Sequence, residues 1–186
     1  MYFQLLPDMT RDQRILSWAE LSDGTPLPLT PSASFVRGVP FDGPQPVHLA
    51  IADPGPDVDF SFGFRHMPVV RRSLAEAIMQ VAPDEIQALD VLIDEEDTDF
   101  VVLNALKLVD CIDESQSVTT PLTDRERAYG RTGKYSMVAM VHLLYDRVGD
   151  AQFFRLTEWP LALIASDRVV DVLKRFEATG VRWEAV

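Results

Sequence analysis

The sequence predicts an α+β fold, in which a mixed or mostly antiparallel sheet of short strands carries two or three short helices packed on it. Apolar segments bounded by turn residues, which are typical of strands, recur about seven times. Two segments repeat apolar residues at the i, i+3, i+4, i+7 spacing of an amphipathic helix. Helices and strands do not alternate strictly, which favours α+β over α/β. The length of 186 residues fits a single domain at residues 1–186.

The N-terminal third is predicted to be one strand followed by irregular chain. Residues 2–6 are aromatic and aliphatic and predict a short strand, which Pro7 ends because proline cannot donate to a ladder. Eight of the 13 prolines lie among residues 24–63, and each disfavours helix at the residue before it. We therefore expect a proline-rich irregular region at residues 22–66, with one strand at 47–52 inside it.

The middle of the chain is predicted to contain one helix and several strands. Ser73 precedes apolar residues at helical spacing, which predicts a short helix capped by this serine. Residues 86–93 and 100–103 are predicted strands, and the acidic run at 94–99 is predicted to be the exposed connection between them. A further strand is expected within 106–112, where two registers are open because either set of alternate residues supplies an apolar face.

Residues 119–165 consist of a mainly polar segment followed by three apolar ones. Residues 119–134 have few apolar side chains and several arginines between proline and glycine, which predicts a mobile surface loop. Apolar and aromatic residues then return at 137–145, 153–156 and 161–165, and polar or proline-containing stretches separate them. These three segments are predicted to be consecutive strands.

The last helix is the best marked element of the chain. Ser166 and Asp167 open it, and its apolar stripe has helical spacing at Val169, Val172, Leu173 and Phe176. Asp167 near the first turn and basic residues near the last turn suit the helix dipole. Gly180 is predicted to end the helical segment, and residues 181–186 are predicted to form a final strand.

Charge narrows the classes of partner. Aspartate and glutamate number 29 against 17 lysines and arginines, which gives a formal charge of −12. This charge opposes binding to nucleic acid and to anionic membrane surfaces, and it favours a protein partner with a basic contact surface. The single cysteine, the absence of a recognisable secretory signal and the lack of a long apolar run predict a cytoplasmic protein with no membrane span.

Catalytic and metal-binding patterns are weak. His48, His66 and His142 are far apart and have no metal-ligand spacing, so neither a metal nor a cofactor site is predicted. Cys111 has anionic neighbours that disfavour the thiolate. His66 lies near Asp57 and Asp59, which leaves one alternative open: a small cytoplasmic hydrolase or ligand-binding enzyme with a site near His66.

The order of several short motifs resembles the Imm11 immunity family, also described as the DUF1629 or MXAN-0049-type immunity domain. The matching segments are a short aromatic N-terminal strand, Asp59-Phe60, a serine-capped helix, Phe100-Val101-Val102-Leu103-Asn104, Val109-Asp110, Ile112-Asp113, Phe154-Arg155-Leu156, Ser166-Asp167 and Thr179-Gly180-Val181. The resemblance is strongest from Phe153 to the C-terminus. It implies a cytoplasmic antidote that binds and blocks a cognate toxin of a bacterial polymorphic, contact-dependent or type VI system, and it implies no catalytic residues.

We therefore expect a non-enzymatic immunity protein that acts by binding another protein. The residues predicted to contact the toxin are acidic or aromatic side chains expected at the surface: Asp59, Asp94, Glu95, Glu96, Asp97, Asp99, Asp110, Asp113 and Trp159. Carboxylates at these positions would steer a basic partner, and a tryptophan would anchor it. The sequence leaves monomer and homodimer open, and it identifies neither the toxin nor the binding face.

Overall fold

The computed structural model describes residues 1–10, 12–21, 35–63, 66–94 and 96–186. These residues form 13 strands in three sheets, together with four helices. The α+β class is confirmed, and the sheets are mixed or antiparallel. The strands outnumber the predicted ones because residues 15–21, 60–63, 67–71 and 118–121, where no strand was predicted, also pair.

The first sheet has five strands in the order β13-β1-β12-β11-β8. β1 (Tyr2–Pro7) lies between β12 (Leu163–Ser166) and β13 (Val181–Ala185) and is antiparallel to both. β11 (Phe153–Leu156) pairs antiparallel with β12 and parallel with β8 (Leu108–Val109). The first strand of the chain is therefore held between two of the last.

The second sheet has six strands in the order β2-β3-β6-β7-β5-β4. Its strands are β2 (Ile15–Leu21), β3 (Val47–Asp53), β4 (Phe60–Gly63), β5 (Met67–Arg71), β6 (Ile86–Ile93) and β7 (Glu96–Ala105). The β3–β6 pair is parallel and the other pairs are antiparallel. The predicted irregular region thus contributes two strands, and its residues 22–34 and 64–65 lie outside the described chain.

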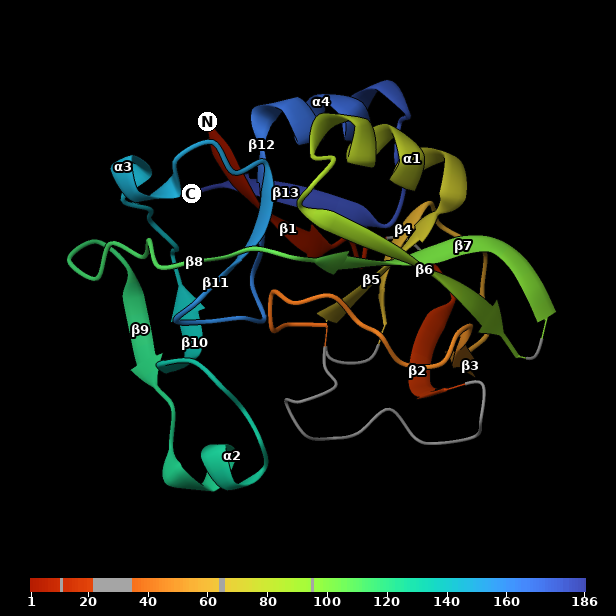
Figure 1. The fold of residues 1–186 in the computed structure, drawn as a ribbon, viewed down its shortest axis with the longest axis horizontal. Coiled ribbons are helices and arrows are strands. Elements are labelled where there is room, and N and C mark those ends of the chain that lie inside the picture. The colour runs from red at the N-terminus through yellow and green to blue at the C-terminus, as the bar shows by residue number, and fades with distance from the viewer. Residues whose placement is uncertain (11, 22–34, 64–65, 95) are drawn as a thin grey trace.

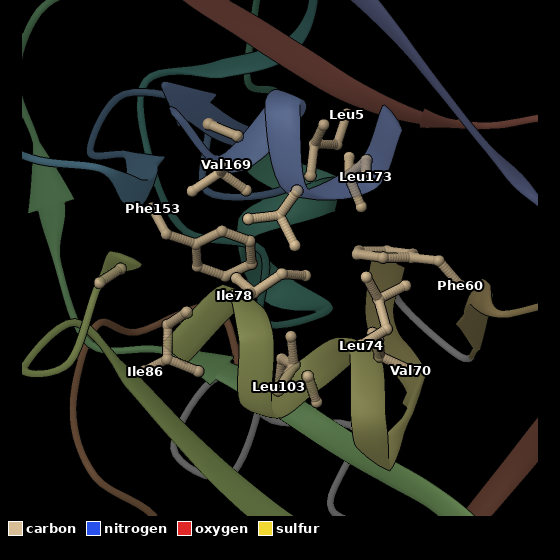
Figure 2. Packing of buried hydrophobic residues seen from close by; sticks show 14 of the residues in the cluster. Leu5, Phe60, Val70, Leu74, Ile78, Ile86, Leu103, Phe153, Val169 and Leu173 are labelled. Carbon is tan, nitrogen blue, oxygen red and sulfur yellow. The ribbon is translucent and has the colours of Figure 1, made fainter. Parts of the chain in front are cut away.

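Two helices lie side by side over the strands, α1 (Arg72–Val81) and α4 (Asp167–Arg175) (Figure 1). Figure 2 shows Leu74 and Ile78 of α1 close to Leu173 of α4, in a cluster that also receives side chains from both large sheets. Full burial of a leucine or isoleucine contributes roughly 1.5–3 kcal/mol. This shared cluster therefore joins the helices and the two sheets.

Several strands are apolar on both faces because both faces are covered. Phe153 points into the cluster under α1 and α4, whereas Phe154 packs into a separate cluster with Tyr135 and Val138. Successive strand residues point to opposite faces, so a continuous apolar run requires a core on each side. This is why residues 153–156 are all buried.

The third sheet is a two-stranded ribbon of β9 (Val118–Pro121) and β10 (Tyr135–Ala139). The short helix α2 (Asp124–Ala128) lies between these strands in the chain, and α3 (Tyr145–Val148) follows them. The ribbon and α2 extend away from the large sheets (Figure 1).

The prediction of a mobile loop at 119–134 is wrong, because these residues contain most of β9 and all of α2. Thr123 and Glu126 form a capping box that stabilises α2, and Leu122 is buried.

Two other predictions need correction. The predicted strand at 137–145 ends at Ala139, because Met140 adopts a φ of 55° that breaks the extended chain, and Tyr145 already begins α3. The strand expected within 106–112 is reduced to β8, since Ile112 makes only an isolated bridge with Leu143.

One helix cap is confirmed and the other is wrong. Ser166 caps α4 as predicted, because its hydroxyl accepts a hydrogen bond from the Val169 amide at 3.4 Å. Ser73 caps nothing, because β5 runs directly into α1 and the helix already begins at Arg72. The N-cap position falls on Arg71, whose side chain accepts no capping hydrogen bond.

Candidate functional site

The carboxylate of Asp59, the first of the predicted contact residues, binds within the chain. Its Oδ1 accepts from Arg71 Nε at 2.9 Å, and its Oδ2 accepts from the amide and hydroxyl of Thr179 at 3.1 and 2.8 Å. Partial burial raises the pKa of Asp59, but the hydrogen bonds from Thr179 and Arg71 outweigh it and hold that pKa below its usual value. Asp59 therefore fastens the start of β4 to the turn before β13.

The neighbouring residues complete this contact. The Phe60 amide donates to the Thr179 carbonyl at 3.0 Å. Gly180 has a φ of +84°, and a Cβ at this position would lie 2.4 Å from the Phe60 carbonyl oxygen. Two of the short motifs, Asp59-Phe60 and Thr179-Gly180-Val181, thus form one interlocked contact, and a structural role accounts for both.

The acidic run forms the turn between β6 and β7. Asp94 has a φ of 50°, and its Oδ1 accepts from the Ile51 amide at 3.0 Å, so it also holds the end of β3. Glu96 and Asp99 are exposed at the start of β7. Glu95 and the side chain of Asp97 lie outside the part of the chain that the structure describes. The prediction that residues 94–99 connect two strands is wrong for residues 96–99, because β7 already begins at Glu96.

A buried carboxyl group lies beside Asp110. Glu158 is 9% exposed, its Oε1 accepts from the Ile112 amide at 3.1 Å, and its Oε2 has no hydrogen-bond partner. Burial raises the pKa of Glu158, and the adjacent Asp110 carboxyl raises it further. Two carboxyl groups can hydrogen-bond only if one of them carries a proton. Burial and the Asp110 carboxyl therefore both favour the protonated form of Glu158.

The carboxylate of Asp113 is also bound locally. Its Oδ1 accepts from the amide and hydroxyl of Ser115 at 2.9 and 2.6 Å, and its Oδ2 accepts from Gln116 at 2.9 Å. These hydrogen bonds, those from Ser115 first, lower the pKa of Asp113. Asp113 keeps its negative charge and organises the turn that precedes β9.

The predicted contact residues do not form one surface. The β6–β7 turn lies at one end of the long axis of the molecule, and the connection from β8 to β9 lies at the other (Figure 1). Trp159 is half-buried and packs against the cluster that contains Phe154, and its Nε1 is buried without a hydrogen-bond partner. The structure therefore brings Asp110 and Glu158 together, but it does not bring the acidic run to them.

The two carboxylates that are near His66 in the sequence have arginine partners. Asp57 pairs with Arg14 at 3.0 Å, and Asp59 pairs with Arg71 at 2.9 Å, so both nearby carboxylates have other partners. Although His66 is exposed, surrounding protein atoms displace part of its water and lower its pKa, and the charges of Arg155 and Arg131 lower it further.

The backbone of His66 has a structural role. Arg155 is fully buried on β11, and its guanidinium donates to the carbonyls of His66 at 2.9 Å, Pro160 at 3.0 Å and Leu161 at 3.3 Å. Burial lowers the pKa of Arg155 to about 9. Arg155 therefore ties the end of the β4–β5 turn to the β11–β12 connection, and this accounts for the Phe154-Arg155-Leu156 motif.

Other features of the described chain offer no catalytic centre. A hollow of about 530 Å³ is lined by Val81 of α1 and by Arg168, Asp171, Val172, Lys174 and Arg175 of α4, and it contains no histidine. Within residues 1–10, 12–21, 35–63, 66–94 and 96–186, no three histidine, cysteine or acidic side chains are placed to hold a metal ion. None of the helices in these ranges has the length and apolar character needed to cross a membrane.

A comparison with protein families shows to which family the chain belongs. The sequence model of the Imm11 immunity protein family matches residues 52–186. The chain belongs to the Imm11 immunity protein family. The Imm11 match includes the motifs from Asp59-Phe60 onward but not the N-terminal strand, and it includes both interlocking contacts, Asp59 with Thr179 and Arg155 with His66. A comparison with curated proteins finds no match.

Sequence reasoning missed the exposed apolar residues of the ribbon. Val118, Met137 and Met140 have exposed fractions of 54%, 52% and 67%. No regular alternation marks them, because Val118 is followed by two threonines and a proline, and a bulge interrupts residues 135–139.

Proposed function

We propose that this chain neutralises a cognate bacterial toxin by binding it as a folded protein in the cytoplasm. Membership of the Imm11 immunity family is the observation that carries the proposal. An immunity role requires affinity and specificity for one partner and needs no reaction centre. The ion-paired carboxylates near His66 also favour binding over a hydrolase site.

The charge of the chain supports a basic region on the toxin. A formal charge of −12 raises the association rate with a cationic surface, mainly through long-range attraction. Glu96 and Asp99 are exposed on the β6–β7 side, and Asp110 and Asp113 contribute at the opposite end. We assign these carboxylates a steering role. Asp59 and Asp94 are mainly occupied by contacts within the chain.

Co-expression tests the proposal directly. The chain is produced in host cells together with the toxin encoded beside its own gene, and survival is compared with that of cells producing the toxin alone. We expect survival to be restored and a stable complex to be purified. Death of the co-expressing cells, with both proteins present and folded, would contradict an immunity role.

A second variant separates binding from catalysis. His66→Ala removes the best candidate for a general base, while the His66 backbone carbonyl that Arg155 binds is retained. We expect this variant to protect cells as well as the natural chain does. Loss of protection by a folded His66→Ala protein that still binds the toxin would favour the enzyme alternative.

A further inference from the structure

One face of the β9–β10 ribbon is exposed and largely apolar. Val118 pairs with Ala139 and Thr120 pairs with Met137, and directly opposed residues lie on the same face of a sheet. All four residues are exposed. Val138 lies on the opposite face and is buried, and a bulge between Tyr135 and Met137 lets Tyr135 pack into the same buried cluster. The ribbon is therefore covered on one side only. We call Val118, Thr120, Met137, Ala139 and Met140 the ribbon face.

Met140 follows directly after the last residue of β10 and is a further exposed apolar residue of this region. It is 67% exposed and has a φ of 55°, a left-handed conformation that residues other than glycine rarely adopt. Single exposed apolar side chains are ordinary, but a group of them on one element marks an interaction surface. Methionine suits such a surface because its flexible thioether adapts to the shape of a partner.

The backbone of the ribbon is also open to a partner. Among the described residues no third strand pairs with β9 or β10, although the start of β10 is partly occupied: the Tyr135 amide donates to the Glu158 carbonyl at 3.0 Å and the Ser136 carbonyl accepts from Arg131 at 2.6 Å. Unpaired strand edges attract another chain, and proteins usually cover or charge them. An apolar face and open edges therefore occur on the same element.

The charge of this region is opposite to that of the rest of the chain. Residues 118–145 contain two acidic and four basic side chains, so they carry a formal charge of +2, and the total of −12 leaves −14 for the other residues. Arg131 pairs with Glu126 and Lys134 pairs with Glu114. Arg125 and Arg127 are exposed and have no ion pair in the described part of the chain.

Tyr129 places an aromatic ring beside Arg125. It is 67% exposed, and the Arg125 guanidinium carbon lies 5.9 Å from its ring centroid. Tyrosine and arginine are among the residues that most often dominate binding energy at protein interfaces. Two copies of the chain that met ribbon to ribbon would bring together four arginines without ion pairs. Their charge repulsion therefore disfavours a second copy as the partner that covers the ribbon.

We propose that the ribbon face, together with Arg125, Arg127 and Tyr129, is the docking surface for the toxin. It fits a toxin surface with an apolar centre and carboxylates on one side of that centre. This inference rests on the proposed function and identifies the contact region for it. The ribbon face supplies buried apolar contact, the two arginines bind carboxylates, and the acidic remainder of the chain steers the approach.

Affinity measurements with matched variants test this assignment. The probe is the purified toxin domain encoded beside the gene, and the dissociation constant is measured by calorimetry. We expect M137S/M140S and, independently, R125E/R127E each to weaken binding at least tenfold. M9S is the matched control, because Met9 is 62% exposed and lies outside the ribbon. We expect M9S to bind as the natural chain does, and unchanged melting temperatures verify the folding of all three variants.

Three outcomes of these measurements would overturn the docking assignment, the immunity role or both. If the natural chain binds the toxin and protects cells while both ribbon variants bind as tightly, the docking assignment is wrong and the immunity role stands. If the folded natural chain does not bind the toxin, both proposals fail. If the free chain sediments as a dimer that M137S/M140S dissociates, a second copy covers the ribbon face and the toxin assignment is overturned.

Discussion

Replacement of Glu158 by glutamine should stabilise the protein at alkaline pH. The glutamine side chain would keep an oxygen for the Ile112 amide, now 3.1 Å from Glu158 Oε1, and its amide group could donate to the Asp110 carboxylate. The natural glutamate can make that second contact only while the pair holds a proton. E158Q therefore removes the need for the proton and retains the shape of the side chain.

The sign and size of the effect follow from the raised pKa of Glu158. A folded-state pKa above the unfolded value means that the folded protein binds the proton more tightly. The contribution of this group to the free energy of unfolding is therefore fully present below the ordinary pKa of 4.5, and it is lost as pH rises through the raised pKa. A difference of one between the folded and unfolded pKa corresponds to about 1.4 kcal/mol. Because Asp110 is exposed and water screens part of this interaction, we expect a gain of about 1 kcal/mol at pH 8.

Thermal unfolding between pH 4 and pH 8 measures this effect. For a chain of this size, 1 kcal/mol raises Tm by roughly 2–4 °C, so E158Q should melt higher than the natural protein at pH 8 and equally at pH 4. E158A should melt lower, because the buried Ile112 amide loses its acceptor at a cost of about 1–3 kcal/mol. E76Q, which neutralises an exposed glutamate on α1, serves as the control. An equal rise in Tm for E158Q at pH 4 and at pH 8 would refute the inference that Glu158 is stabilised in its protonated form.

Three further outcomes are expected. D59A should lower the free energy of unfolding by about 2–3 kcal/mol in chemical denaturation at pH 7, because Thr179 and Arg71 lose their acceptor. Since the pKa of Asp59 is lowered, its contribution is present above the ordinary pKa and lost as pH falls, so D59A should also flatten the acid decline in stability. G180A should cost about 1–3 kcal/mol, because its φ is +84° and a Cβ would meet the Phe60 carbonyl at 2.4 Å. Burial raises the pKa of Cys111 to about 12, so this thiol should react with an aromatic disulfide reagent only after unfolding.

Controls separate these effects from general damage. D57A removes a carboxylate that is nearly adjacent in sequence and pairs only on the surface with Arg14, and it should cost less than about 1 kcal/mol. G149A is the matched glycine control, because Gly149 also has a positive φ, of +65°, but nothing lies within 4 Å of the added Cβ. Equal losses for G180A and G149A would show that backbone strain, rather than contact with Phe60, sets the cost. Rapid reaction of Cys111 in the folded protein would contradict its burial.

Periodicity predicted the elements that local residues determine. The stripe of Val169, Val172 and Leu173 and the cap at Ser166 define α4, and the apolar pattern of 86–93 matches β6. These elements were predictable because a periodic apolar face and a capping hydroxyl act within a few residues. α2 was missed although Thr123 and Glu126 have capping-box spacing, since that pattern precedes no apolar run.

The buried charged groups could not be predicted in the same way. Arg155 and Glu158 lie within four positions on β11 and the following turn, yet one binds backbone carbonyls and the other pairs with Asp110. Both environments are created by segments distant in sequence. Asp59 was interpreted as a contact residue for the same reason, because its partner Thr179 is 120 residues away.

The position of β1 between β12 and β13 has a consequence for synthesis on the ribosome. β1 is translated long before both of its neighbours, so its backbone hydrogen-bonding groups stay without these partners until residues 163–185 have been synthesised. Sheets that join such distant segments form slowly because a long loop must close first. A nascent chain, or a chain that lacks residues 163–185, would therefore expose the apolar β1 segment to chaperones and proteases.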